Sequence, residues 1–109
     1  PLGIPASFYL PHKTGTLISS TTAETLSGMM ARNVSEVYGS GRFPNMDICA
    51  KSGTAEVGGG KTPTSWFSGF LRNEDAPYAF AVVVEEGGSG SKTAGGVASS
   101  VLNALVNGD

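Results

Sequence analysis

The sequence has few of the residues that build disulfides, metal sites or membrane spans. It contains one cysteine, Cys49, and one histidine, His12, so an internal disulfide is excluded. His12 has no Asp, Cys or second His at a spacing suited to a metal site or a catalytic triad. The longest wholly apolar run, Tyr78 to Val84, is far too short to span a bilayer. We therefore expect no metal, no cofactor and no membrane contact by this segment.

Charged side chains are also few, and neither sign dominates. The 109 residues include 7 basic and 9 acidic side chains, with a net charge of −2 and no clustered basic run. Nucleic acid is therefore not an expected partner, because such binding requires a basic surface. The apolar share of 39% suits one small globular domain or part of one. Within it, Cys49 is expected to be a small buried hydrophobe rather than a reactive thiol.

The first half of the chain predicts a loop followed by a helix. Residues 1–20 are rich in Pro, Ser and Thr and predict a loop, with a short extended stretch at 7–10. A helix is predicted from Thr21 to Tyr38, because Thr21 and Glu24 have capping-box spacing and Gly39 to Gly41 can end it. Its apolar face is expected to comprise Leu26, Met30, Val34 and Val37.

The second half predicts three strands and a final helix. The strands are expected over residues 46–54, 64–71 and 78–85, and the third should be central because it is almost continuously apolar. A helix from Thr93 to Val106 follows, with Gly108 as its stop and an apolar stripe of Ala94, Val97, Ala98, Val101, Leu102 and Leu105. The fold class is α+β, with three antiparallel strands, a preceding helix and a C-terminal helix packed on the sheet.

The motif Lys51-Ser52-Gly53-Thr54 carries the clearest chemistry. A cation, two hydroxyls and a glycine at a strand end can bind a carboxylate and a developing oxyanion. Strict alternation sends Lys51 and Gly53 to one face of the strand and Ser52 and Thr54 to the other. The motif therefore works only if the strand presents its edge, or a local twist, to the ligand.

Three other stretches look like sites but have the wrong context. Residues 13–16 (Lys-Thr-Gly-Thr) follow no strand and are expected to be loop. The glycine-rich segment 58–62 lacks the spacing and the helix of a phosphate-binding loop. Ser89 and Lys92 fit Ser-x-x-Lys, in which lysine can activate serine, but their Gly-rich surroundings predict a turn and a helix cap.

The order of these features resembles the C-terminal portion of the penicillin-binding protein transpeptidase domain, in the class B style. Lys-Ser-Gly is a variation of the Lys-Thr-Gly element of that family. The strand 66–70 (Trp-Phe-Ser-Gly-Phe), the Ala/Val strand ending in Glu85 to Gly88, and the two helices are similar too. The resemblance covers residues 18–107. It implies that residues 1–109 are the C-terminal part of one transpeptidase domain whose upstream part, with the nucleophile, is absent.

The resemblance implies a serine D,D-transpeptidase that cross-links peptidoglycan stem peptides ending in D-Ala-D-Ala and is acylated by β-lactams. Lys51 would supply charge and hydrogen bonds to the serine side, and the hydroxyls of Ser52 and Thr54 would hold the ligand carboxylate. The Thr54 N–H would be one oxyanion donor, and Gly53 would let the acyl group approach. Lys51 and Thr54 are the candidate catalytic residues. Ser52, Gly53 and Thr54 are the candidate substrate-binding residues.

The same resemblance limits what this chain does alone. No Ser-x-Asn occurs in the sequence, and its Ser-x-x-Lys lies on the wrong side of the lysine motif, so we expect the isolated chain to be inert. We also expect it to need the missing N-terminal part to complete its core. The parent would act at the extracytoplasmic face of the bacterial membrane, with an anchor elsewhere. The alternatives are the C-terminal part of a serine β-lactamase, of a non-catalytic β-lactam-sensing receptor, or an unrelated binding module.

Overall fold

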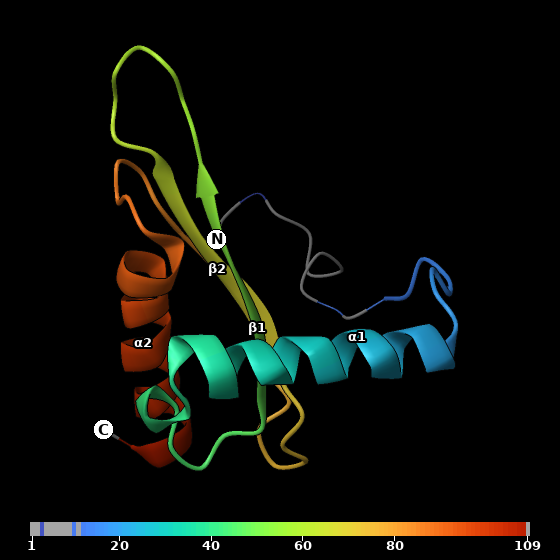
Figure 1. The fold of residues 1–109 in the computed structure, drawn as a ribbon. Coiled ribbons are helices and arrows are strands. Elements are labelled where there is room, and N and C mark those ends of the chain that lie inside the picture. The colour runs from blue at the N-terminus through green and yellow to red at the C-terminus, as the bar shows by residue number, and fades with distance from the viewer. Residues whose placement is uncertain (1–2, 4–9, 11, 109) are drawn as a thin grey trace.

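The computed structural model describes Gly3, Leu10 and residues 12–108, so the extended stretch expected at 7–10 falls largely outside it. Two helices flank one small sheet (Figure 1). Residues 13–16 lie in a loop, as expected. In order, the elements are α1 (Ser20–Asn33), the π-helical turn η2 (Val34–Tyr38), the 3-10 turn η3 (Ser40–Arg42), β1 (Ile48–Ala55), β2 (Thr64–Leu71), β3 (Ala79–Val84), the π-helical turn η4 (Gly90–Ala94) and α2 (Gly95–Asn107).

The sheet is antiparallel with strand order β1-β2-β3, which confirms the expected fold class. The second strand has the predicted bounds. The prediction that the third strand is central was wrong, because within the described residues β3 pairs only with β2. Its side chains alternate between exposed and half-buried. A strand of Ala and Val presents apolar side chains on both of its faces, whether or not other elements cover them. Composition alone therefore did not reveal that one face of β3 is exposed.

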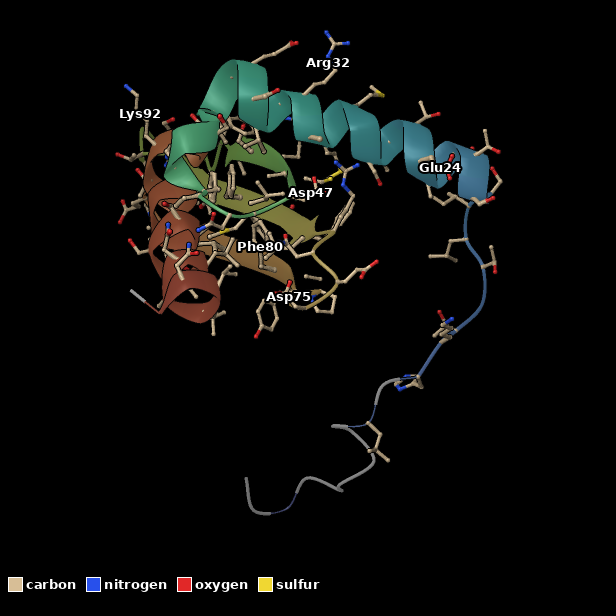
Figure 2. The ribbon with its side chains drawn as sticks, turned by 90° about the horizontal axis from the view of Figure 1, so that it is seen from below. Glu24, Arg32, Asp47, Asp75, Phe80 and Lys92 are labelled. Atoms are coloured by element: carbon tan, nitrogen blue, oxygen red, sulfur yellow. The ribbon has the colours of Figure 1, made fainter. Side chains whose placement is uncertain are left out.

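One face of the sheet carries the core, and Phe67 lies at its centre. Its side chain is fully buried. The Tyr38 ring meets it edge-on at 5.2 Å between centroids, and Phe43 and Phe80 stack against it at 6.0 and 6.1 Å. The helices complete this layer with Val34, Ala94, Ala98 and Leu102. Figure 2 shows Phe80 directed into the same interior.

Beyond the buried Cys49, the other face of the sheet is open in the described part of the chain. The registers place Lys51, Trp66 and Val83 together on that face, and Trp66 and Val83 are 42% and 46% exposed. Ala79 and Ala81 of β3 are exposed beside them. An indole and several aliphatic side chains therefore contact solvent on a sheet whose opposite face is well packed.

The first helix begins one residue earlier than predicted and buries less. Ser19 is its cap, since its Oγ accepts the Thr22 N–H at 3.1 Å. The capping box expected at Thr21 was therefore wrong, because Thr21 already lies within the helix. Figure 1 shows why little of the apolar stripe is covered: only the C-terminal end of α1 reaches the body of the molecule. Val34 is buried, whereas Leu26 and Val37 are exposed.

The last helix starts with η4 rather than at Thr93. Ser89 caps this turn, and Gly108 ends α2 in the left-handed conformation with φ of 74°, as predicted. Of the expected stripe, the small residues and one leucine are buried, namely Ala94, Ala98 and Leu102. Val97, Val101 and Leu105 are about half exposed. The helix therefore packs on the sheet along a narrower line than the sequence pattern indicates.

Gly69 permits the close approach of β1 and β2. A Cβ there would overlap the Cys49 carbonyl oxygen and would lie 2.9 Å from the Ala50 Cα. At Gly28, in the middle of α1, a Cβ would meet no neighbouring atom within 4 Å. The two glycines are thus a matched pair, one required by packing and one merely tolerated.

We expect Gly69→Ala to lower the free energy of unfolding by about 1–3 kcal/mol, because strand backbone must move to admit the methyl group. Gly28→Ala should raise it by about 0.5–1 kcal/mol through helix propensity. Urea denaturation of the protein measures both changes. Equal effects of the two substitutions would contradict the packing described for Gly69.

Candidate active-site wall

The lysine motif lies on the outer edge of β1, which pairs only with β2 in the part of the chain that the structure describes. In an antiparallel pair, the N–H and C=O of one residue point to the same side, and those of the next residue point to the other. The Arg72 N–H donates to the Asp47 carbonyl at 2.8 Å, so the peptide N–H and C=O groups of the odd-numbered residues of β1 point toward β2. The peptide groups of Ala50, Ser52 and Thr54 therefore point outward, away from the sheet.

The first part of this edge is covered by the end of α1 and by η2. Asn33 Nδ2 donates to the Ala50 carbonyl at 3.2 Å. The Ser52 N–H donates to the Tyr38 hydroxyl oxygen at 2.9 Å. Thr54, two residues further along, is exposed, and its N–H faces outward by the same alternation. The usable part of the edge thus begins where the cover by Tyr38 ends.

Lys51 reaches this edge from the open face. Its side chain is exposed, and its Nζ donates to the outward-facing Ser52 carbonyl at 2.7 Å. The strand pairs one to one with β2 through the motif, so no bulge brings the side chains to one face. Instead, the ammonium folds over the edge from one side while the Ser52 hydroxyl borders it from the other. The edge is the place where the motif residues converge.

The two motif hydroxyls border the core face, each with a partner from another element. Ser52 Oγ accepts from the Tyr38 hydroxyl at 3.1 Å. Thr54 Oγ1 accepts from the Gly90 N–H at 3.2 Å. Gly53 lies between them on the opposite face, where an added Cβ would sit 3.3 Å from the Trp66 Cβ. Close packing against Trp66 is thus one structural reason for glycine at this position.

The turn η4 is fixed beside the motif by Ser65, which is fully buried. Its Oγ donates to the Ser89 carbonyl at 2.9 Å and accepts the Ala94 N–H at 3.0 Å. Gly90 then lies directly on the strand, where a Cβ would overlap the Gly53 carbonyl oxygen. Arg42 holds the same turn from the other side, donating from Nη1 to the Ser91 carbonyl at 2.8 Å.

The Ser-x-x-Lys stretch is a helix cap, as predicted. Ser89 Oγ accepts the Lys92 N–H at 3.4 Å, and the Lys92 side chain is exposed. Figure 2 shows Lys92 at the outer rim, directed away from the body of the molecule. The contact between the two residues is thus a backbone cap, and the lysine side chain lies in solvent rather than beside the serine hydroxyl.

The rest of the described chain bears on three further points: a metal site, a membrane-spanning helix and a pocket. The described residues contain no group of three His, Cys, Asp or Glu able to hold a metal ion. Among the helices that the structure describes, none is long and apolar enough to cross a bilayer. A hollow of about 470 Å³ lies under the β1–β2 loop, lined by Lys61, Glu85 and Glu86 among others, and the motif residues do not line it.

Sequence reasoning did not identify the groups that orient the motif: Tyr38, Ser65 and Gly90. Tyr38 is four residues after Val34, so its place on the buried helical face could have been found from spacing. Nothing in the local sequence indicated that its hydroxyl reaches Ser52. That contact joins residues far apart in the chain and depends on how the helix crosses the strand.

Comparison with known proteins places these features in context. Residues 7–107 match the family described as the penicillin binding protein transpeptidase domain. The chain is 30% identical over 100 residues to the peptidoglycan D,D-transpeptidase PbpA of Mycolicibacterium smegmatis, covering 88% of this chain and 20% of that protein. It thus spans about a fifth of the length of that relative.

Solved structures show the same fold. Penicillin-binding protein A from M. tuberculosis, as an imipenem acyl-enzyme complex, matches with a TM-score of 0.65 and 30% identity, over 82% of this chain and 20% of that one. The D,D-transpeptidase domain of a peptidoglycan glycosyltransferase from Eggerthella lenta matches with a TM-score of 0.62 and 32% identity, over 84% and 22%. Both likenesses agree with the expected helix–sheet–helix arrangement.

Cys49 is fully buried, as predicted, and burial raises the pKa of its thiol. The positive charge of Arg72 opposes this pKa shift, and the Asp47 carboxylate adds to it. A raised pKa leaves less thiolate at a given pH, so we expect iodoacetamide to label Cys49 only after the protein is unfolded in urea. Mass spectrometry of alkylated protein measures this. Equal labelling rates in the native and unfolded states would contradict the burial.

Proposed function

Because the chain belongs to the penicillin-binding protein transpeptidase family, we propose that it forms the carboxylate-binding and oxyanion wall of a serine D,D-transpeptidase site. The observation that carries this proposal is the free edge of β1, where Lys51, Ser52 and Thr54 converge on one outward-facing stretch of backbone. A cation and hydroxyl donors beside a free N–H suit an anionic acyl substrate.

Each motif residue has a role in this proposal. The Lys51 ammonium supplies positive charge to the side where the nucleophile stands. The hydroxyls of Ser52 and Thr54 donate to the ligand carboxylate. The outward Thr54 N–H donates to the carbonyl oxygen as it becomes an oxyanion, a contribution of about 3–4 kcal/mol to transition-state stabilisation. Gly53 leaves the strand without a side chain where the acyl group approaches.

The nucleophile comes from elsewhere in the domain in this proposal, since the sequence holds no Ser-x-Asn and its Ser89 lies in a helix cap. Residues 1–109 are then the C-terminal part of one transpeptidase domain. The open sheet face and the outer edge of β3, unpaired in the described residues, support this division. The remainder of the domain would cover apolar surface that Trp66 and Val83 leave exposed.

The reaction is acyl transfer. The serine oxygen attacks the carbonyl carbon of the D-Ala-D-Ala peptide bond, and the C–N bond breaks so that D-Ala leaves with a proton on its amine. The amine of a second stem peptide then attacks the ester, forms the cross-link and restores the serine hydroxyl. β-Lactams acylate the same serine by opening their ring. Peptidoglycan lies outside the cytoplasmic membrane, so the parent protein acts on that side.

We expect the isolated chain to remain unlabelled by a fluorescent penicillin, because it holds the wall and not the nucleophile. A domain that joins it to a Ser-x-x-Lys segment of the same parent should be labelled at that serine. Gel fluorescence after denaturation measures both. Stable labelling of the isolated chain would contradict the proposed division of the site. Rapid hydrolysis of nitrocefin by the complete domain would favour a β-lactamase instead.

In that complete domain, Lys51→Ala should slow acylation by at least about 100-fold, the effect of losing one preorganised charge or donor at the reacting centre. Lys61→Ala is the matched control, because Lys61 is an exposed lysine in the β1–β2 loop. Its acylation rate should stay within about twofold of the unsubstituted domain. Stopped-flow fluorescence measures both rates, and similar rates for the two variants would remove Lys51 from the site.

A further inference from the structure

The two hydroxyls of the motif share a hydrogen-bonding arrangement that the sequence did not reveal. A hydroxyl has one hydrogen to donate and two lone pairs that accept. Ser52 Oγ accepts from Tyr38 at 3.1 Å, and Thr54 Oγ1 accepts from the Gly90 N–H at 3.2 Å. In both cases the protein occupies an acceptor position. Among the described residues neither hydroxyl hydrogen has an acceptor, so each stays available for a ligand.

The direction of these bonds at Tyr38 follows from the backbone. The Ser52 N–H can only donate, and it donates to the Tyr38 oxygen at 2.9 Å. The hydrogen of Tyr38 is then free to bond Ser52 Oγ. This produces a chain in one direction: from the Ser52 N–H to Tyr38, from Tyr38 to Ser52 Oγ, and from Ser52 outward. Each donation strengthens the next one.

Tyr38 is well placed to hold this direction. Its ring is buried and packs edge-on against Phe67 at 5.2 Å, so the hydroxyl has little freedom to move away from β1. A carboxylate only accepts hydrogen bonds. If the Ser52 hydrogen were spent on the protein, a lone pair would face the anion and repel it. A fixed donor at Tyr38 prevents that arrangement.

We propose that Tyr38 is a positioning residue, which makes the Ser52 hydroxyl a donor to the carboxylate of the ligand. This inference rests on the proposed function, since it assigns a cause to the orientation of a group within that site. The Gly90 N–H sets the Thr54 hydroxyl in the same way, and Ser65 holds Gly90 in place. Two elements outside the motif thus prepare it for an anion before any ligand arrives.

The test is a double-mutant cycle in the complete domain, with acylation by benzylpenicillin as the readout. Tyr38→Phe removes the hydroxyl and keeps the ring, and it should lower the acylation efficiency about tenfold, the size expected for one hydrogen bond to a charged group. In a Ser52→Ala background the same substitution should change the efficiency by less than about twofold. Tyr78→Phe is the matched control, because Tyr78 is 42% exposed and lies just before β3, the strand separated from β1 by β2.

A second readout separates orientation from general damage. The methyl ester of benzylpenicillin lacks the carboxylate charge, and competition against a fluorescent penicillin measures its acylation. Tyr38→Phe should reduce acylation by the free acid about tenfold and by the ester less than about twofold. Equal losses for both compounds, or a loss that persists with Ser52→Ala, would overturn the inference and leave the proposed function standing. A complete domain that neither compound acylates would overturn both.

Discussion

The contact between Tyr38 and β1 determines which part of the strand edge is covered and which part is open. Its ring belongs to the core through Phe67, and its hydroxyl closes the edge at Ser52. Asn33 covers the edge two residues earlier, where it donates a hydrogen bond to the Ala50 carbonyl. An exposed strand edge offers unpaired donors and acceptors that attract any extended chain. The helix and the turn that follows it cover only the beginning of β1, so the Thr54 N–H remains exposed. The neighbouring Ser52 hydroxyl accepts its hydrogen bond from Tyr38, in that same turn.

This arrangement explains how residues on opposite faces of a strand can serve one site. Alternation places Lys51 and Ser52 on different faces, and the regular register of β1 preserves that separation. The faces meet at the edge, where the ammonium folds over to the Ser52 carbonyl. A rigid strand is a precise support for such groups, because backbone hydrogen bonds to β2 fix their positions. The serine of the Ser-x-x-Lys stretch, Ser89, is a helix cap, so we propose that the edge is one wall of a site whose nucleophile lies elsewhere in the domain.

The sequence predicted most of the elements and the motif, and it failed where tertiary context decides. The bounds of β2 and the stop at Gly108 follow from local pattern and turn chemistry, and both were correct. The place of β3 was wrong, because an apolar run does not tell a covered strand from one whose cover lies outside the described residues. The cap at Ser19 was missed because Thr21 and Glu24 fit the same signal two residues later. The role of Tyr38 depends on a helix crossing a strand, which no local spacing encodes.

The central claim is that the free edge of β1 between Ser52 and Thr54 is where the ligand binds. A crystal structure of the complete domain acylated by a β-lactam tests this most directly. The account predicts a ligand carboxylate within hydrogen-bonding distance of Ser52 Oγ and Thr54 Oγ1, and an acyl carbonyl oxygen within the same distance of the Thr54 N–H. A ligand whose carboxylate and carbonyl oxygen both lie away from this edge, with these three donors facing water, would contradict it.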